Sequence, residues 1–182
     1  IVPRGTMMDS LALKKTGVTC SYTTAHEVNL LPLKIDNVEL GGVPADLPLA
    51  QLGLSQRGIN SALRIRIACD GPQNLGHLNF DQLTFFLSGP DIEALKLLEL
   101  VMEHHAGIVC QTVSPQPQRQ LLASDALCQE GFAADQALLP DDLRNFDGYR
   151  LLQEYFAFPA RFRFISLSGL STLIQRCEGE KA

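Results

Sequence analysis

The chain has 182 residues, of which 46% are hydrophobic and 19% are charged, and its formal net charge is -5. This composition excludes wholesale disorder, and the length is sufficient for one domain with a sizeable core. No run of about 18 uncharged apolar residues occurs, which argues against a membrane span. No cluster of basic residues is visible, so the sequence offers no electrostatic site for nucleic acid or an acidic membrane surface.

Residues 1–7 are predicted to be the remainder of an expression tag and the start of the expressed insert, because residues 1–6 resemble a cleaved tag. We then expect an N-terminal segment at 8–27, a single α+β domain at 28–170 and a C-terminal tail at 171–182. An odd number of cysteines without a CxxC pair predicts reduced thiols. The cysteines are Cys20, Cys69, Cys110, Cys128 and Cys177.

Alternating hydrophobicity predicts strands in the first half of the chain. In residues 28–40 the apolar positions share one face, and Pro32 indicates an edge strand or a bulge. Residues 41–56 are rich in glycine and proline and are predicted to form a loop. Strict alternation over residues 61–69 predicts a second strand, and residues 80–87 are expected to return beside it as a hairpin with a long connection.

Residues 91–105 predict a long helix. We expect Ser88 to cap its first turn, Pro90 to open it and Gly107 to end it. Its polar residues form one narrow stripe, and apolar residues occupy the other positions. Such a helix is expected to be buried around more than half of its circumference, against a sheet and a second element.

The second half of the chain predicts shorter elements. They are strands at 108–113 and 161–167, one or two strands within 121–132, a short helix at 132–139, and a helix that Asp147 caps and Pro159 ends. Arg150 and Glu154 are spaced for an ion pair on this last helix. Together these elements predict an α+β fold with mostly antiparallel strands, one long buried helix and a second short helix packed on the sheet.

Few residues of the sequence are arranged for catalysis or metal binding. His104 and His105 are adjacent on a helix and point about 100° apart, so they do not easily share a metal. A position at a helix C-terminus explains them more simply. His26 and His77 stand alone in the sequence and are predicted to be surface or turn residues.

Other reactive residues have plain structural interpretations. Cys69 and Cys110 lie in apolar strands, where burial raises the pKa of a thiol and disfavours a nucleophile. The carboxylates Asp141 and Asp142 are predicted to be solvated in a loop beside a proline. No serine-hydrolase elbow, phosphate-binding loop or dinucleotide fingerprint occurs. We therefore predict no catalytic, cofactor-binding or metal-binding residue.

Two alternatives remain open at this level. One is a hydrolase-like enzyme that uses a cysteine or a serine with His26 or His77. The other is a regulatory module that binds a small anion at Arg64 and Arg66, although two arginines on the wet face of a sheet are usually solvated.

The segment at residues 146–159 carries a family resemblance. Its sequence, FDGYRLLQEYFAFP, resembles the signature of the TssF family, also called ImpG or VasA, whose members are baseplate subunits of the type VI secretion system. Weaker similarities elsewhere extend the match over residues 28–170. Asp147 stands at a common proline position and is compatible with an N-cap, and Ala160 and Arg161 replace an acidic-basic pair. These departures resemble ordinary drift and put no implied role in doubt.

The resemblance implies a structural, non-enzymatic subunit without a cofactor. Family members pair with each other and with the TssG subunit in wedges, which surround the spike and dock onto the tail sheath and the membrane complex through other baseplate proteins. The resemblance therefore implies a cytoplasmic protein that lies at the inner face of the cell envelope when assembled. Family chains are much longer than this one, so the resemblance implies an internal portion.

The signature segment supports two interpretations. Its apolar stripe fills the core of this domain, or it forms a contact surface for a partner subunit. The candidate interface residues are Phe146, Gly148, Tyr149, Arg150, Leu151, Leu152, Gln153, Glu154, Tyr155, Phe156 and Pro159.

Overall fold

The structure is a computed structural model that describes residues 1–14, 16–55, 57–71, 75–139 and 146–176. Contacts between residues divide the chain into two compact units. Unit 1 consists of residues 1–30 and 129–164, and unit 2 consists of residues 31–128 and 165–182. Residues 28–170, which we predict as a single domain, therefore contribute to both units.

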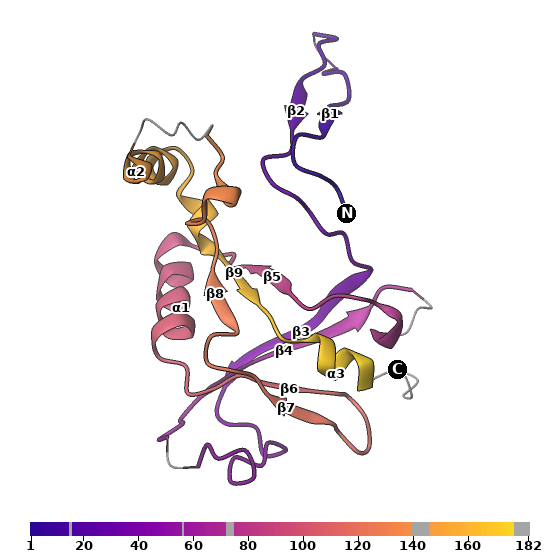
Figure 1. The fold of residues 1–182 in the computed structure, drawn as a ribbon, viewed down its shortest axis with the longest axis vertical. Coiled ribbons are helices and arrows are strands. Elements are labelled where there is room, and N and C mark those ends of the chain that lie inside the picture. Colours follow the sequence, from indigo (N-terminus) through magenta and orange to yellow (C-terminus); the bar gives the residue numbers. More distant parts are fainter. Residues whose placement is uncertain (15, 56, 72–74, 140–145, 177–182) are drawn as a thin grey trace. The chain divides into compact units, whose positions relative to one another are not determined.

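Unit 1 contains short strands, short 3-10 helices and an α-helix (Figure 1). They are β1 (Met7–Asp9), β2 (Ser21–Thr23), η2 (Ala134–Gln136), α2 (Asp147–Ala157) and η3 (Pro159–Arg163). Strands β1 and β2 pair antiparallel, and Val2 forms an isolated bridge with Val28.

Unit 2 contains most of the strands and two helices. Its elements are β3 (Leu33–Gly41), β4 (Ala62–Cys69), η1 (Leu75–His77), β5 (Leu83–Phe86), α1 (Asp91–Glu103), β6 (Val109–Gln111), β7 (Arg119–Leu121), β8 (Leu127–Gln129), β9 (Phe164–Leu167) and α3 (Ser171–Arg176). Strands β8 and β9 begin or end at the division between the units. The mixture of helices and antiparallel strand pairs confirms the predicted α+β class.

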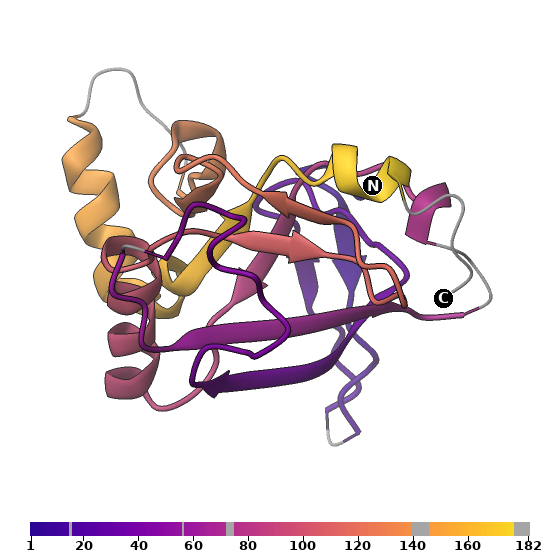
Figure 2. The same ribbon diagram turned by 90° about the horizontal axis from the view of Figure 1, so that it is seen from below.

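The longest strand pair joins β3 and β4 (Figure 2). The alternating segment at residues 61–69 is β4, as predicted. The predicted strand at residues 28–40 begins later, at Leu33, and its register shifts between Ile35 and Asn37. The sequence predicts an edge strand or a bulge from Pro32, and both features are present, because β3 lies at the edge of a two-stranded sheet.

The predicted hairpin between residues 61–69 and 80–87 is wrong. Strand β4 pairs with β3, and β5 belongs to a three-stranded sheet of order β5-β9-β8. The physical reason is that alternation identifies a half-buried strand but does not identify its partner. Strand β3 matches β4 over eight paired positions, whereas β5 has only four residues.

Helix α1 buries one side. Leu98 packs in a cluster with Leu87 and Ile165, while Ile92 is 70% exposed and Leu100 is 53% exposed. The expectation of burial around more than half of the circumference is therefore wrong for this chain by itself.

Two details of the ends of α1 also differ from the prediction. Pro90, rather than Ser88, is the N-cap residue and no side chain caps the helix, while the helix ends at Glu103 with His104 as its C-cap.

Gly107 has a packing role in place of the predicted helix stop. A Cβ atom at this position would lie 3.2 Å from a methyl carbon of Leu54 and 3.3 Å from one of Leu121. Leu54 belongs to the predicted loop and is only 3% exposed. The loop therefore closes over the start of the β6–β7 hairpin, and the glycine permits the close approach.

The second hydrophobic cluster of unit 2 lies around α3. Leu122, Ala126, Leu170 and Ile174 are its buried members. Two backbone N–H groups near the start of α3, those of Gly169 and Ser171, donate hydrogen bonds to the carboxylate of Asp81. The tail predicted at residues 171–182 therefore contains a short packed helix over residues 171–176.

Unit 1 differs from the prediction after Pro159. The chain forms the 3-10 turn η3, and the strand predicted at residues 161–167 begins only at Phe164. Phe162 is 7% exposed and its ring lies 5.2 Å from that of Phe132 and 5.9 Å from that of Tyr155. The short helix predicted at residues 132–139 is one 3-10 turn, η2.

Candidate interaction site

Glu154 occupies the buried side of α2. Its side chain is 1% exposed, and such a carboxylate requires charged or hydrogen-bonding partners. The backbone N–H groups of Leu138 and Leu139 donate to its Oε1 at 3.0 and 3.1 Å. Arg150 Nη1 lies 3.3 Å from the same oxygen, so the predicted ion pair one turn apart is present. The prediction treats this pair as local support, whereas the structure buries it.

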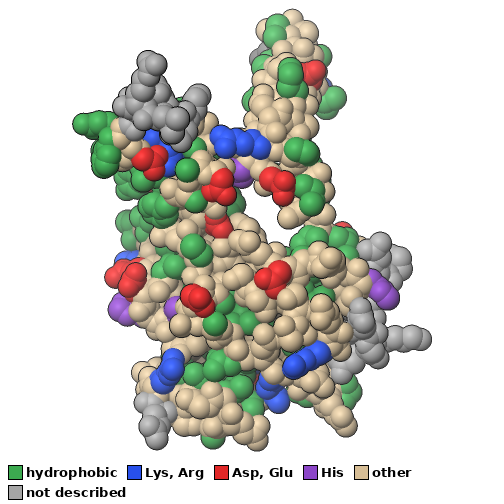
Figure 3. All heavy atoms as spheres, viewed as in Figure 1, with side chains coloured by type: hydrophobic (Ala, Val, Ile, Leu, Met, Phe, Trp, Pro, Cys, Tyr) green, Lys and Arg blue, Asp and Glu red, His purple; other side chains and the backbone are tan. Residues whose placement is uncertain are grey.

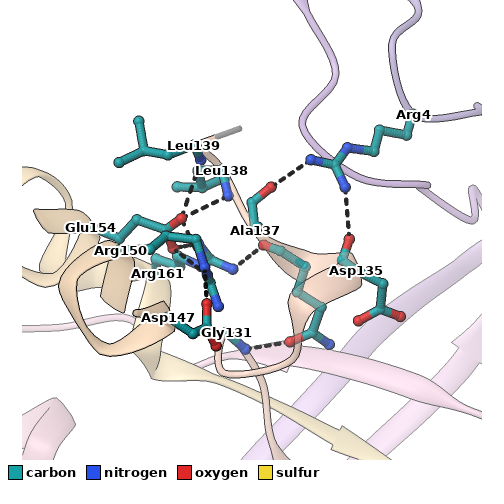
Figure 4. A network of polar contacts seen from close by, with 11 residues as sticks. Arg4, Gly131, Asp135, Ala137, Leu138, Leu139, Asp147, Arg150, Glu154 and Arg161 are labelled. Carbon is teal, nitrogen blue, oxygen red and sulfur yellow. Dashed lines mark hydrogen bonds and ion pairs between the residues drawn. The ribbon is translucent and has the colours of Figure 1, made fainter. Parts of the chain in front are cut away.

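Arg161 completes the shell around Glu154 (Figure 4). Its Nη1 donates to Glu154 Oε2, and its Nη2 donates to the backbone carbonyl of Gln136. The sequence does not predict this contact, because Pro159 ends the helix and residues 161–167 are predicted to form a strand. The turn at Pro159 reverses the chain so that Arg161 returns to the helix. An arginine two residues after a helix-ending proline is a sequence signal that could have indicated this contact.

The polar cluster extends to the beginning of the chain. Arg4 donates from Nη1 to the carbonyl of Asp135 at 3.1 Å and from Nη2 to the carbonyl of Ala137 at 2.8 Å. Ala137 is 1% exposed. Residues 1–7, predicted to come from an expression tag, thus contact η2 and the segment that follows it. We call Arg150, Glu154 and Arg161 the polar anchor of α2.

The polar anchor contains more donors than its own acceptors satisfy. Among the described residues, Arg150 Nη2 and Arg161 Nε have no hydrogen-bond partner although both atoms are buried. Burial lowers the pKa of the Arg161 guanidinium, and the positive charge of Arg150 lowers it further. Asp147 accepts from Arg150 Nε at 2.7 Å, and this hydrogen bond holds the pKa of Asp147 below its usual value. The ion pairs among Asp147, Arg150, Glu154 and Arg161 therefore fix the orientation of α2 about its axis.

The opposite side of α2 is apolar and exposed. Tyr149, Leu152 and Phe156 follow an i, i+3, i+7 spacing and are 65%, 56% and 80% exposed. Phe146 extends this surface at the N-terminal end, and Tyr155 extends it toward the C-terminal end. We call Phe146, Tyr149, Leu152, Tyr155 and Phe156 the aromatic face. Figure 3 shows apolar side chains gathered at the surface of α2.

Gly148 makes room for one ring of the aromatic face. A Cβ atom at this position would overlap the ring of Phe146, which folds back over the first turn of the helix. The Phe146 ring lies edge-on to the ring of Tyr149 at a centroid distance of 5.7 Å. This is a favourable geometry for an aromatic pair. The glycine of the signature therefore shapes the surface at the helix start.

The structure bears on the two interpretations of the signature segment. Helix α2 packs on its own unit mainly through Arg150 and Glu154, which are 7% and 2% exposed, and Tyr155 of the apolar stripe lies beside the buried ring of Phe162. Leu151 is the only stripe member predicted from the sequence that is half-buried; Leu152, Tyr155 and Phe156 are exposed. Gln153 and Pro159 are also exposed. The arrangement leaves the stripe available for a contact outside this unit.

The residues weighed for catalysis belong to different elements and to both units. Burial raises the pKa of the Cys110 thiol to about 11, in the direction predicted from its apolar strand. Cys69 is half-buried in β4. His105 has a buried Nδ1 without a hydrogen-bond partner in the described part of the chain. Asp141, Asp142 and Cys177 lie outside the described residues.

The anion site considered at Arg64 is already occupied by a carboxylate of the same chain. Arg64 Nη2 lies 2.5 Å from Asp46 Oδ1, and Gln111 donates to Asp46 Oδ2 at 3.1 Å. These contacts hold the pKa of Asp46 below its usual value. The pair ties the loop after β3 to β4 and β6 and offers a structural role for Arg64.

The described ranges contain no group of three or more histidine, cysteine, aspartate or glutamate residues placed to hold a metal ion. Their helices are all too short or too polar to cross a membrane.

Comparison with known proteins identifies the family. A sequence model of the family described as "Type VI secretion system, TssF" matches residues 1–182. The match includes residues 1–7. The chain therefore belongs to the TssF family, as its signature segment predicts.

A curated relative supports this assignment. The chain is 38% identical over 165 residues to the type VI secretion system component TssF1 of Pseudomonas aeruginosa. The aligned part is 89% of this chain and 26% of TssF1. The chain thus spans about a quarter of the length of the curated relative it matches.

A solved structure has the same fold. The chain matches a chain of the type VI secretion system TssK-TssF-TssG baseplate subcomplex, solved by cryo-electron microscopy, with a TM-score of 0.72 and 24% identity. The match covers 94% of this chain and 29% of the other. At this level of identity the likeness establishes the fold.

Proposed function

We propose that this chain is part of a structural scaffold subunit of the type VI secretion system baseplate, which forms wedge complexes with partner subunits. The observation that carries the proposal is the exposed aromatic face of α2, within a chain of the TssF family. An exposed apolar patch of this kind is typical of a protein–protein contact. In this proposal the subunit acts by binding partner subunits through its surface, and it performs no catalysis.

The proposal extends to the partners of the full-length protein. We expect the full-length protein to bind a second copy of itself, TssG and other baseplate subunits. The solved relative belongs to a TssK-TssF-TssG baseplate subcomplex, which supports the heteromeric part of this proposal. We place the assembled protein in the cytoplasm at the inner face of the cell envelope, without insertion in the membrane and without nucleic acid.

Co-purification tests the proposal. The full-length protein is expressed with tagged TssG of the same secretion system, and the complex is isolated on the tag and by size-exclusion chromatography. We expect a stable complex with a fixed stoichiometry that also recruits TssK. Failure of the full-length protein to bind any baseplate subunit contradicts the proposed function.

A further inference from the structure

We propose that the apolar side of strand β3 is covered, in the full-length protein, by a segment of the same polypeptide that lies outside residues 1–182. We call Leu33, Ile35, Val38 and Leu40 the β3 face. The inference goes beyond the proposed function, because it concerns how the polypeptide completes its own fold and does not depend on which subunits the protein binds.

A bulge in β3 places these four side chains on one face of the strand. Leu33 and Ile35 occupy odd positions and Val38 and Leu40 occupy even ones, so a regular strand would direct the two pairs to opposite faces. The register shift between Ile35 and Asn37 inserts one extra residue. In β4 the partners of the β3 face are therefore the alternate residues Cys69, Ile67, Ile65 and Leu63. The β3–β4 strand pair thus has one continuous apolar face.

This apolar face is partly covered at β4 and open at β3. The apolar residues of β4 are half-buried, whereas Ile35, Val38 and Leu40 are 57%, 53% and 66% exposed. The opposite face of the strand pair carries charged residues, with Glu39 opposite Arg64. A strand pair with one apolar and one polar face packs the apolar one against a second layer. Among the described residues that layer does not bury the β3 face.

The free edge of β3 is poorly suited to an added strand. Within the described ranges β3 pairs with no strand other than β4. The bulge at Asp36 interrupts the regular row of backbone groups, and the charged residues Lys34 and Glu39 flank it. Such features protect an edge strand against further pairing. We therefore expect the covering segment to pack its side chains on the β3 face and not to extend the sheet.

The total exposed surface favours a cover from the same polypeptide. The chain exposes 12929 Å², whereas a folded protein of 19.9 kDa is expected to expose about 8,700 Å². Even two separate globules with the sizes of units 1 and 2 would expose only about 10,400 Å² together. The remaining excess of about 2,500 Å² is typical of a portion cut from a larger packed structure. In agreement, the chain spans only 26% of the length of TssF1.

A separate chain would gain too little from the β3 face. Its exposed side chains present on the order of 200 Å² of apolar surface, about a quarter of the roughly 800 Å² that each partner buries in a stable complex. A separate partner also loses translational and rotational freedom on binding. A segment of the same polypeptide is held nearby by the chain and loses much less. The small area therefore favours such a segment over TssG, TssK or a second copy.

Thiol labelling of the full-length protein, purified without other baseplate subunits, tests the inference. Val38→Cys places a thiol on the β3 face, and the matched control Glu39→Cys places one on the opposite face of the same strand. Both positions lie in the tryptic peptide of residues 35–57, which contains no natural cysteine, so mass spectrometry reads each thiol separately. We expect iodoacetamide to modify the thiol at position 38 at least about tenfold more slowly than the thiol at position 39.

Three labelling results overturn the inference. The first is an equal rate at the two positions, which would mean that the β3 face is open. The second is protection that appears only after TssG or TssK is added, and the third is protection that disappears on dilution, as for a second copy. Circular dichroism and thermal unfolding verify that both variants are folded, and Leu40→Cys replaces Val38→Cys if the latter is not.

A crosslinking experiment identifies the covering segment directly. A photoreactive benzoylphenylalanine replaces Leu40 in the full-length protein, and the products are mapped by mass spectrometry. Crosslinks to the same polypeptide outside residues 1–182 support the inference, and crosslinks within residues 1–182 overturn it. A mixture of unlabelled and isotope-labelled protein detects crosslinks between two copies, which also overturn it. Failure to bind any baseplate subunit contradicts the proposed function alone, because neither experiment on the β3 face requires a partner.

Discussion

Glu154 and Phe156 are separated by one residue on α2, yet Glu154 is 2% exposed and Phe156 is 80% exposed. Two positions on a helix differ by about 200° around the axis, so the two side chains lie on opposite faces. The usual amphipathic arrangement is reversed, because the ionised side chain points inward and the aromatic ring points outward. The polar anchor explains the inward side, and the outward side is the exposed surface on which the proposed function rests.

Removal of the buried carboxylate is expected to destabilise the chain strongly. Glu154→Ala leaves Arg150 and Arg161 buried without their shared acceptor, and the expected loss is about 3–5 kcal/mol in the free energy of unfolding. Urea unfolding followed by circular dichroism measures it. The adjacent exposed residue provides the control, and Gln153→Ala should change stability by less than about 0.5 kcal/mol. Equal effects of the two substitutions would contradict the role of the polar anchor.

Substitution in the aromatic face is expected to leave the fold intact. Phe156→Gln replaces a side chain that is 80% exposed, so the free energy of unfolding should change by less than about 0.5 kcal/mol. Phe162→Ala, at a ring only 7% exposed, should cost about 3–5 kcal/mol. Thermal unfolding of both variants tests the difference. A large loss with Phe156→Gln would mean that this ring belongs to the core.

Acid is expected to loosen the start of α3 through Asp81. Hydrogen bonds from Ser171 and Gly169 hold the pKa of Asp81 below the ordinary value of 3.8. The carboxylate therefore stabilises the fold above about pH 4, and this contribution disappears as the pH falls through the lower pKa of the folded state. Protection of the Ser171 amide from hydrogen exchange should decrease in this range. In Asp81→Asn the protection should be lower at neutral pH and should lose this pH dependence.

Thiol labelling should distinguish two cysteines of unit 2. Burial raises the pKa of Cys110 to about 11, whereas Cys128 is exposed. At pH 8 iodoacetamide should modify Cys128 within minutes and leave Cys110 unmodified until the chain is unfolded in urea. Mass spectrometry of the tryptic peptides measures both sites. Rapid modification of Cys110 in the folded chain would contradict the protection of this half-buried thiol in β6.

Gly131 is expected to tolerate no side chain. Its φ angle is +106°, and a Cβ atom would lie 3.2 Å from the ring of Phe162. Gly131→Ala combines backbone strain with a crowded ring and should cost about 1–3 kcal/mol in the free energy of unfolding. Gly42→Ala, at a glycine in open space without a positive φ, should change stability little. Chemical denaturation compares the two, and similar values would argue against a tight contact at Gly131.

Local sequence patterns identified several elements because the residues that form each pattern are close together in the chain. The alternation that gave β4 depends on residues two positions apart, and the spacing that gave α2 depends on residues three and four apart. Strand pairing was not predictable in the same way. Strand β5 pairs with β9, about 80 residues further along the chain, and no periodicity within β5 indicates that choice.

The sequence alone determined the α+β class, the helix at residues 147–157 and, through its signature segment, the TssF family. Only the tertiary structure decided which side of that helix faces its own unit. An apolar stripe is equally suited to a core or to a partner, so its pattern cannot choose between them. The choice depends on Arg161 and on the N–H groups of Leu138 and Leu139, which stabilise a buried carboxylate from segments that are distant along the chain.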